Sequence, residues 1–155
     1  TNVIASMEGI DALKGKVWVT RKNLFVDRIG CGWLIRRFVD EAAMFKYVDS
    51  DTYAPDPGEI RFDMFEGEYT HEGDQCTFEV IAKRLNLQDP GLVALSEVIH
   101  DIDLKDNKYN RNETDGLNAL LTGLAASETS DEKRMKKGAL FMENLYAFFH
   151  RQKGN

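Results

Sequence analysis

The sequence has no long apolar run. None of its hydrophobic segments approaches the roughly 20 residues that a helix needs to span a bilayer. Its start, TNVIASMEGIDALKG, also lacks the basic beginning and apolar centre of a secretory signal peptide. We therefore expect a soluble protein with no membrane partner, and the cytoplasm is its default location.

Cysteine is scarce as well. Cys31 and Cys76 are the only two in the chain, and two cysteines are too few for a disulfide scaffold. Packing in the core, metal ligation and redox chemistry are the uses that remain for them.

Positive charge is in deficit, because 20 Lys and Arg residues face 26 Asp and Glu residues, for a net charge of −6. This balance argues against broad attraction to nucleic acid or to an anionic membrane, although a local basic patch can still bind a small oxyanion. The sequence also lacks a phosphate-binding loop, a dinucleotide-binding glycine fingerprint, a nucleophile elbow and an HExxH motif. These absences argue against the corresponding enzyme classes.

The length of 155 residues fits one domain, which we place at 1–155 with residues 1–15 as a candidate flexible arm. Short β-branched and aromatic segments predict strands in the first half, and longer amphipathic segments predict helices in the second. We expect an α+β fold, with a small mixed β-sheet in the N-terminal half and a helical C-terminal half packed on it. The strands are expected at 16–20, 43–49, 59–62 and 68–71, and the helices at 27–39, 77–87, 90–104, 113–126 and 131–151.

The segment VDRIGCGWLIRRFVD, residues 26–40, places several polar side chains on one predicted helix. Asp27 is expected as its N-cap, and Cys31 shares a face with both Asp27 and Arg28. Because a helix N-terminus favours anions, Arg28 and Arg21 are candidates for binding a small oxyanion. The alternative is an ordinary amphipathic helix, in which Asp27 only caps, Arg28 is solvated and Cys31 is a core residue.

The segment THEGDQCTF, residues 70–78, leaves a predicted strand and enters a predicted helix. Its glycine-containing turn can bring the His71 imidazole and the Cys76 thiol around one metal ion. A cysteine near a helix start also has its thiolate favoured, which makes Cys76 a redox candidate. The alternative is a hydrogen-bonded histidine in a turn and a packed cysteine.

The segment IHDID, residues 99–103, lies near a predicted helix end, where His100 and Asp103 share a face. This arrangement suits metal ligation, and it suits an exposed helix terminus equally well. What favours a site is that the candidates in all three segments lie at the ends of predicted elements, where sites are usually built. The candidate metal ligands are His71, Cys76, Asp27 and Asp103.

With these residues in view, the chain resembles the chromate resistance (ChrB-type) domain family. The likeness runs through WVTR, VDRIGCGWLIRRFVD, FKYV and THEGDQCTFEVI, and more loosely through VIHDIDL and the last two helices. The chain has Leu24 and Gly32 where the family pattern has prolines, and both differences relax the start of the first long helix. The resemblance implies a stress-response role in chromate resistance, as a regulator that senses chromate or as an accessory to its export.

Two main hypotheses follow. In the first, Arg21 and Arg28 hold an oxyanion such as chromate, while His71, Cys76 and an aspartate bind a divalent metal. The mixed nitrogen, sulfur and oxygen donors favour zinc or iron. Whether such a site would be that of a metal-dependent enzyme, and on which substrate, stays open.

In the second hypothesis the domain is a non-catalytic regulator, in which oxidation of Cys31 and Cys76 alters a contact with a partner. A third reading takes the arginine-rich helix as a plain surface helix. The sequence does not indicate the oligomeric state.

Overall fold

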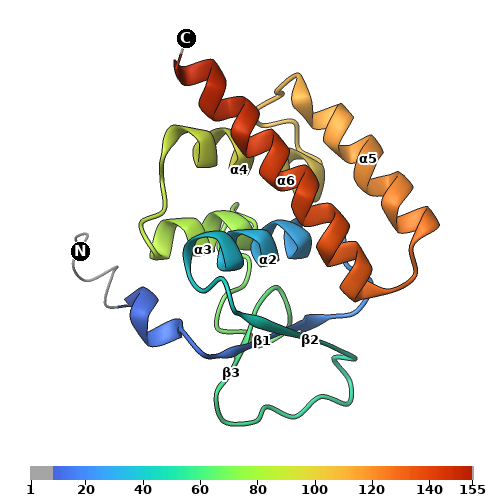
Figure 1. Ribbon diagram of the computed structural model, residues 1–155. Helices are drawn as coiled ribbons and strands as arrows, with labels where there is room; N and C mark the ends of the chain where they lie inside the picture. The colour runs from blue at the N-terminus through green and yellow to red at the C-terminus, as the bar shows by residue number, and fades with distance from the viewer. Residues whose placement is uncertain (1–8, 155) are drawn as a thin grey trace.

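The computed structural model describes residues 9–154 of the chain (Figure 1). Residues 1–8 of the expected flexible arm lie outside the described part. Residues 9–13 are helical, and Ile10 and Leu13 pack against the core. Within residues 9–154, no helix combines the length and the apolar composition needed to cross a membrane.

A three-stranded sheet organises the N-terminal half. β1 (Val17–Arg21) lies in its centre, between β2 (Met44–Val48) and β3 (Glu59–Arg61), and both neighbours run parallel to it. The three middle residues of β1 are completely buried. This burial is what a central strand of a parallel sheet requires, because both of its faces must be covered.

The α+β class is confirmed, and the sheet is parallel rather than mixed. A helix connects β1 to β2, and such a crossover brings the chain back to the same end of the sheet, which makes the two strands parallel. The loop at 49–58 does the same between β2 and β3. The strand expected at 68–71 forms only an isolated bridge between Tyr69 and Phe62.

The helices gather on one side of the sheet, whereas the loop between β2 and β3 projects on the other side (Figure 1). The last and longest helix contacts three of the others, so the helical half forms one packed layer. In chain order the helices are α2 (Val26–Phe38), α3 (Thr77–Arg84), α4 (Pro90–Leu104), α5 (Glu113–Ser127) and α6 (Asp131–Gly154).

Two glycines let the other helices approach α2 closely. A Cβ at Gly30 would lie 2.9 Å from Ile99 of α4 and 3.1 Å from Phe78 of α3, and a Cβ at Gly32 would overlap the end of Met135 of α6. Protein interiors are close-packed, so such contacts leave no room for a methyl group. The first turn of α2 is therefore held tightly against the start of α3.

Candidate metal site around His71

The sequence predicted Asp27 as the N-cap of its own helix, and this prediction was wrong. α2 begins at Val26, with Phe25 at the N-cap position and no side-chain cap. The Asp27 carboxylate, only 2% exposed, instead accepts hydrogen bonds from the backbone N–H groups of Thr77 at 3.0 Å and Phe78 at 2.9 Å. Asp27 therefore caps the neighbouring helix α3, because the close approach of α2 places its side chain at that helix start.

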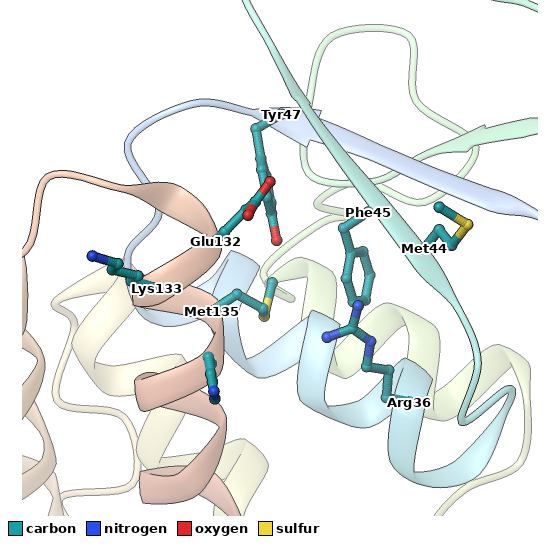
Figure 2. Close-up of a pocket in the computed structure, with 8 residues that line it drawn as sticks. Arg36, Met44, Phe45, Tyr47, Glu132, Lys133 and Met135 are labelled. Carbon is teal, nitrogen blue, oxygen red and sulfur yellow. The ribbon is translucent and has the colours of Figure 1, made fainter.

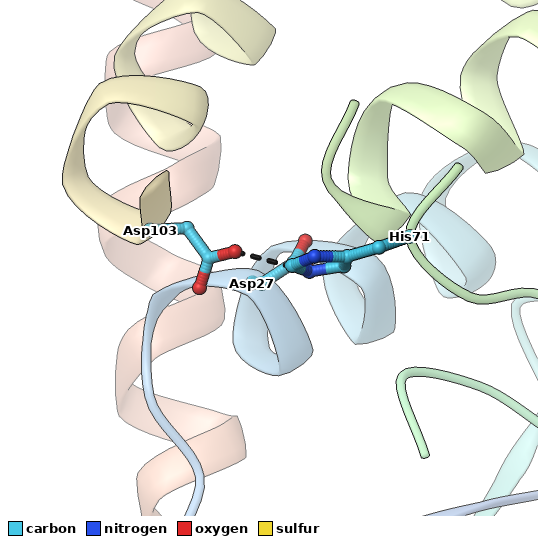
Figure 3. A group of neighbouring side chains, drawn as sticks. All are labelled: Asp27, His71 and Asp103. Carbon is cyan, nitrogen blue, oxygen red and sulfur yellow. Dashed lines mark hydrogen bonds and ion pairs between the residues drawn. The ribbon is translucent and has the colours of Figure 1, made fainter. Parts of the chain in front are cut away.

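His71 brings two distant carboxylates together (Figure 3). Its Nε2 atom lies 3.1 Å from Asp27 Oδ2 and 3.1 Å from Asp103 Oδ2, near the end of α4. One ligand atom from each of these three residues lies within 4.8 Å of the other two, which is the spacing of a group that can hold a metal ion. Three segments far apart in the sequence thus converge on one point.

A third carboxylate, Asp63, completes the acidic surroundings of His71. Asp63 Oδ1 lies 3.5 Å from His71 Nε2 and accepts a hydrogen bond from the Thr77 hydroxyl at 3.0 Å. Asp63 lies between the strands expected at 59–62 and 68–71, and the sequence did not single it out as a site residue. The available signal was its place just after the end of an expected strand, where functional residues are commonly found.

The local charges favour a cation. Burial, followed by repulsion from Asp27, raises the pKa of Asp63 and that of Asp103 to about 6 each. The hydrogen bond with Asp27 is the main cause that raises the pKa of His71 to about 9. Because Asp27 contributes to all three shifts, the carboxylates of the site repel one another and attract a cation.

One oxygen in this group has no hydrogen bond. Asp103 Oδ2 is buried and has no hydrogen-bond partner among residues 9–154, although His71 Nε2 is 3.1 Å away. The geometric reason is that Nε2 carries a single hydrogen, and its hydrogen bond is made with Asp27. A buried, unsatisfied carboxylate oxygen is costly, and a bound cation would satisfy it.

The arginines expected to bind an oxyanion are largely engaged with protein acceptors. Arg28 Nη1 donates to the carbonyl oxygens of Arg21 at 3.1 Å and Lys22 at 2.9 Å, and Arg28 Nε lies 3.4 Å from Asp63 Oδ2. Arg21 Nε donates to the Asp63 carbonyl oxygen at 3.2 Å. Oxyanion binding by Arg21 and Arg28 stays a prediction, and three neighbouring carboxylates oppose it in the absence of a metal.

A hollow adjoins the site on its open side. It has a volume of about 310 Å³, and its lining includes Arg21, Asp63 and His71. The side chain of His71 is 42% exposed. A small ligand can therefore reach the ring of His71 from solvent.

Neither cysteine belongs to the group around His71. The Cys31 thiol is buried and lies 3.7 Å from Asp27 Oδ1, and Cys76 is the buried N-cap residue of α3, where its side chain and Glu79 form a capping box. Burial, followed by the Asp27 charge, raises the pKa of both thiols. Protonated, enclosed thiols are poor nucleophiles and poor ligands, so the local geometry does not favour a redox role.

His100 belongs to a separate cluster. Its Nδ1 lies 2.6 Å from Glu79 Oε1 and its Nε2 lies 2.9 Å from Asp106 Oδ2. The adjacent Asp101 accepts backbone hydrogen bonds from Tyr109 and Asn110. Both ring nitrogens of His100 are thus occupied by carboxylates, and the cluster fastens the loop after α4 to the body of the protein.

Comparison with known proteins identifies the family. The sequence-family model of the ChrB C-terminal domain matches residues 18–149 of this chain. This chain belongs to the ChrB C-terminal domain family. A relative is Protein ChrB of Cupriavidus metallidurans, 34% identical over 137 residues, which are 88% of this chain and 41% of the relative. The chain thus spans less than half the length of that protein, and no solved structure matches it.

Proposed function

We propose that this ChrB-type domain binds a divalent metal ion through His71, Asp27 and Asp103, and that it acts in chromate resistance as a sensor or accessory. The observation that carries the proposal is the convergence of the three side chains, with one buried Asp103 oxygen left without a hydrogen bond. Family membership supports the association with chromate resistance.

The spacing of the donors suits a transition metal. Two ligand atoms at about 2.1 Å from a zinc ion are roughly 3 to 3.5 Å apart. The His71 Nε2 atom is 3.1 Å from an oxygen of each aspartate, so a metal would bind with little rearrangement. One imidazole and two carboxylates suit zinc or iron, and they leave coordination positions open.

The metal also provides a way for an anion to bind at an acidic site. Without it, the carboxylates of Asp27, Asp63 and Asp103 repel a dianion such as chromate. A divalent ion would offset that charge and present an open position towards the hollow beside His71. Arg21 lines the same hollow and would supply hydrogen bonds to the outer oxygens of the anion.

Calorimetric titration of the metal-stripped protein with Zn²⁺, and anaerobically with Fe²⁺, tests the metal site. We expect one saturable site, which is lost in His71→Ala because the variant removes the only nitrogen donor of the group. His150→Ala is the matched control, since this histidine lies on α6 and contacts Tyr146 and Asp89 instead. A wild-type protein that takes up no stoichiometric metal, or equal affinity in His71→Ala, would refute the assignment.

Titration with chromate tests the second half of the proposal. We expect chromate to bind the metal-loaded protein and not the metal-stripped protein. Equal binding to both forms would show that the metal has no part in it. Loss of that binding in Arg28→Gln would then support an arginine-based oxyanion site.

A further inference from the structure

A second hollow in the described part of the chain lies away from His71. It has a volume of about 550 Å³ and opens between β2 and the first turns of α6, beside the end of α2 (Figure 2). None of its lining residues belongs to the group around His71. A cavity of this size is typical of sites for small organic molecules.

Three cationic side chains line this hollow: Arg36, Lys133 and Lys136. None of them has a carboxylate within ion-pairing distance among residues 9–154, in a chain whose net charge is −6. Glu132 is the one acidic residue in the lining, so cations predominate. This local excess of positive charge is complementary to an anion.

Arg36 is held in place for such a contact. Its Nε donates to the Ala43 carbonyl oxygen at 3.0 Å, and its guanidinium carbon lies 4.4 Å from the ring centroid of Phe45. The two terminal nitrogens make no hydrogen bond within the described part of the chain. An arginine stacked on an aromatic ring presents these donors in a fixed plane, at low entropic cost, to a carboxylate or a phosphate.

The remaining wall is apolar and aromatic. Phe45, Tyr47 and Met135 face the hollow, and Figure 2 shows the Tyr47 hydroxyl pointing into it. That hydroxyl makes no hydrogen bond with any described residue. Burial raises the pKa of Tyr47 to about 12, so the hydroxyl stays a neutral donor. A flat apolar ring would find contacts here that a small inorganic ion cannot use.

We propose that this hollow binds a small organic anion, a molecule with a flat ring and one phosphate or carboxylate group. The acidic group would lie against Arg36 and the two lysines, and the ring against Tyr47 and Met135. A tetrahedral oxyanion alone would occupy only a small part of the space and leave the apolar wall unused. This inference does not depend on the metal site.

An NMR titration of the full chain tests the proposal with four probes. Adenosine 5′-monophosphate represents a ring with a phosphate and 2-naphthoate a ring with a carboxylate, whereas adenosine and inorganic phosphate supply the ring and the charge alone. We expect saturable shifts at Arg36, Tyr47 and Lys133 with at least one of the two ring-bearing anions. Adenosine and phosphate should each bind about tenfold more weakly, because each lacks one set of contacts.

Two variants and two controls complete the test. Arg36→Gln and Lys133→Gln should each weaken binding of the ring-bearing anion about tenfold, which is the value of one charged hydrogen bond. Lys137→Gln should leave binding unchanged, since Lys137 pairs with Glu128 outside the hollow. His71→Ala should also bind normally, which separates this site from the metal site.

Three results would overturn the proposal. In the first, neither ring-bearing anion causes saturable chemical shift changes. In the second, Lys137→Gln weakens binding as much as Arg36→Gln does, which would indicate nonspecific attraction. In the third, phosphate alone binds as tightly as adenosine 5′-monophosphate, which would show that the ring is not recognised.

Discussion

Asp27 holds three parts of the chain together. Its two oxygens accept the backbone N–H groups at the start of α3, and the same carboxylate contacts His71 and the thiol of Cys31. Each carboxylate oxygen has two lone pairs, so a metal held by Asp27 and His71 would take the place of the hydrogen bond between these two residues. One buried side chain can therefore serve the fold and the candidate site at once.

We predict that Asp27→Asn lowers the free energy of unfolding by about 2 kcal/mol, because the amide forfeits charge-assisted bonds to two backbone N–H groups. Urea denaturation of the metal-free protein measures the change. Asp49→Asn is the control, since Asp49 makes only an exposed ion pair with Lys22 and its loss should have little effect. Equal stability of Asp27→Asn and the wild type would show that the cap contributes nothing.

His71 makes the stability of the metal-free protein depend on pH. Its pKa is raised from 6.5 to about 9 in the folded state, chiefly by Asp27, so the stability that this contact contributes is present below pH 6.5 and is lost as the pH rises through 9. We predict that the free energy of unfolding falls over this window. Because the side chain is 42% exposed, solvent screening reduces the effect to a fraction of the full linkage value.

Urea denaturation at a series of pH values measures the slope, and His71→Gln should flatten it. A slope that is unchanged in this variant would assign the effect to another group. Since a metal must displace the same proton, the affinity for Zn²⁺ should rise between pH 6.5 and about 9.

At the scale of elements, two glycines of α2 determine how closely the neighbouring helices pack against it. Gly30 and Gly32 carry no side chain where the neighbouring helices approach most closely. In an isolated helix such glycines only reduce stability. In this fold they allow α3, α4 and α6 to pack against α2, and this packing places Asp27 at the start of α3.

We predict that Gly32→Ala destabilises the protein by about 1 to 3 kcal/mol, because the new methyl group would overlap the buried Met135. Gly123→Ala is a matched control in α5, where a Cβ meets nothing within 4 Å. This second substitution should stabilise the protein by roughly 0.5 to 1 kcal/mol, because alanine is the better helix former. Thermal unfolding of both variants measures the difference, and a stabilised Gly32→Ala would contradict the packing argument.

The sequence predicted most of the elements and their order. Periodicity predicted a buried strand at 16–20, which is β1 (Val17–Arg21) in the structure, and it located the helices from α2 to α6 within a few residues. It could not predict that the sheet is parallel, because strand direction depends on how the chain returns between strands. It also suggested the wrong cap for α2, because a local rule assigned the Asp27 carboxylate to its own helix.

At the scale of the whole molecule, opposite charges are kept apart. The acidic group around His71 lies at the starts of α2 and α3 and near the end of α4, whereas the cationic hollow lies between β2 and α6. Each arrangement leaves groups of one sign poorly compensated by the protein itself. A cation at the first place and an organic anion at the second would offset these two imbalances.

The reactivity of the two cysteines depends on whether the whole protein is folded. Both are completely buried, and burial raises the pKa of both thiols. We predict that neither reacts with a thiol reagent such as 5,5′-dithiobis(2-nitrobenzoate) in the native protein, and that both become reactive at the urea concentration where the helices unfold. Fast reaction of either cysteine in the native protein would contradict this expectation and revive the redox hypothesis.

Residue spacing alone predicted strands with one helix among them in the first half, helices in the second half, and which polar side chains lie at the ends of these elements. Those features follow from short-range periodicity and from local backbone preferences, which the sequence carries directly. Only the tertiary structure decided which of those side chains meet. His71 was joined by Asp27, Asp63 and Asp103 but not by Cys76, because the positions where packed helices end depend on contacts between residues that are distant in the chain.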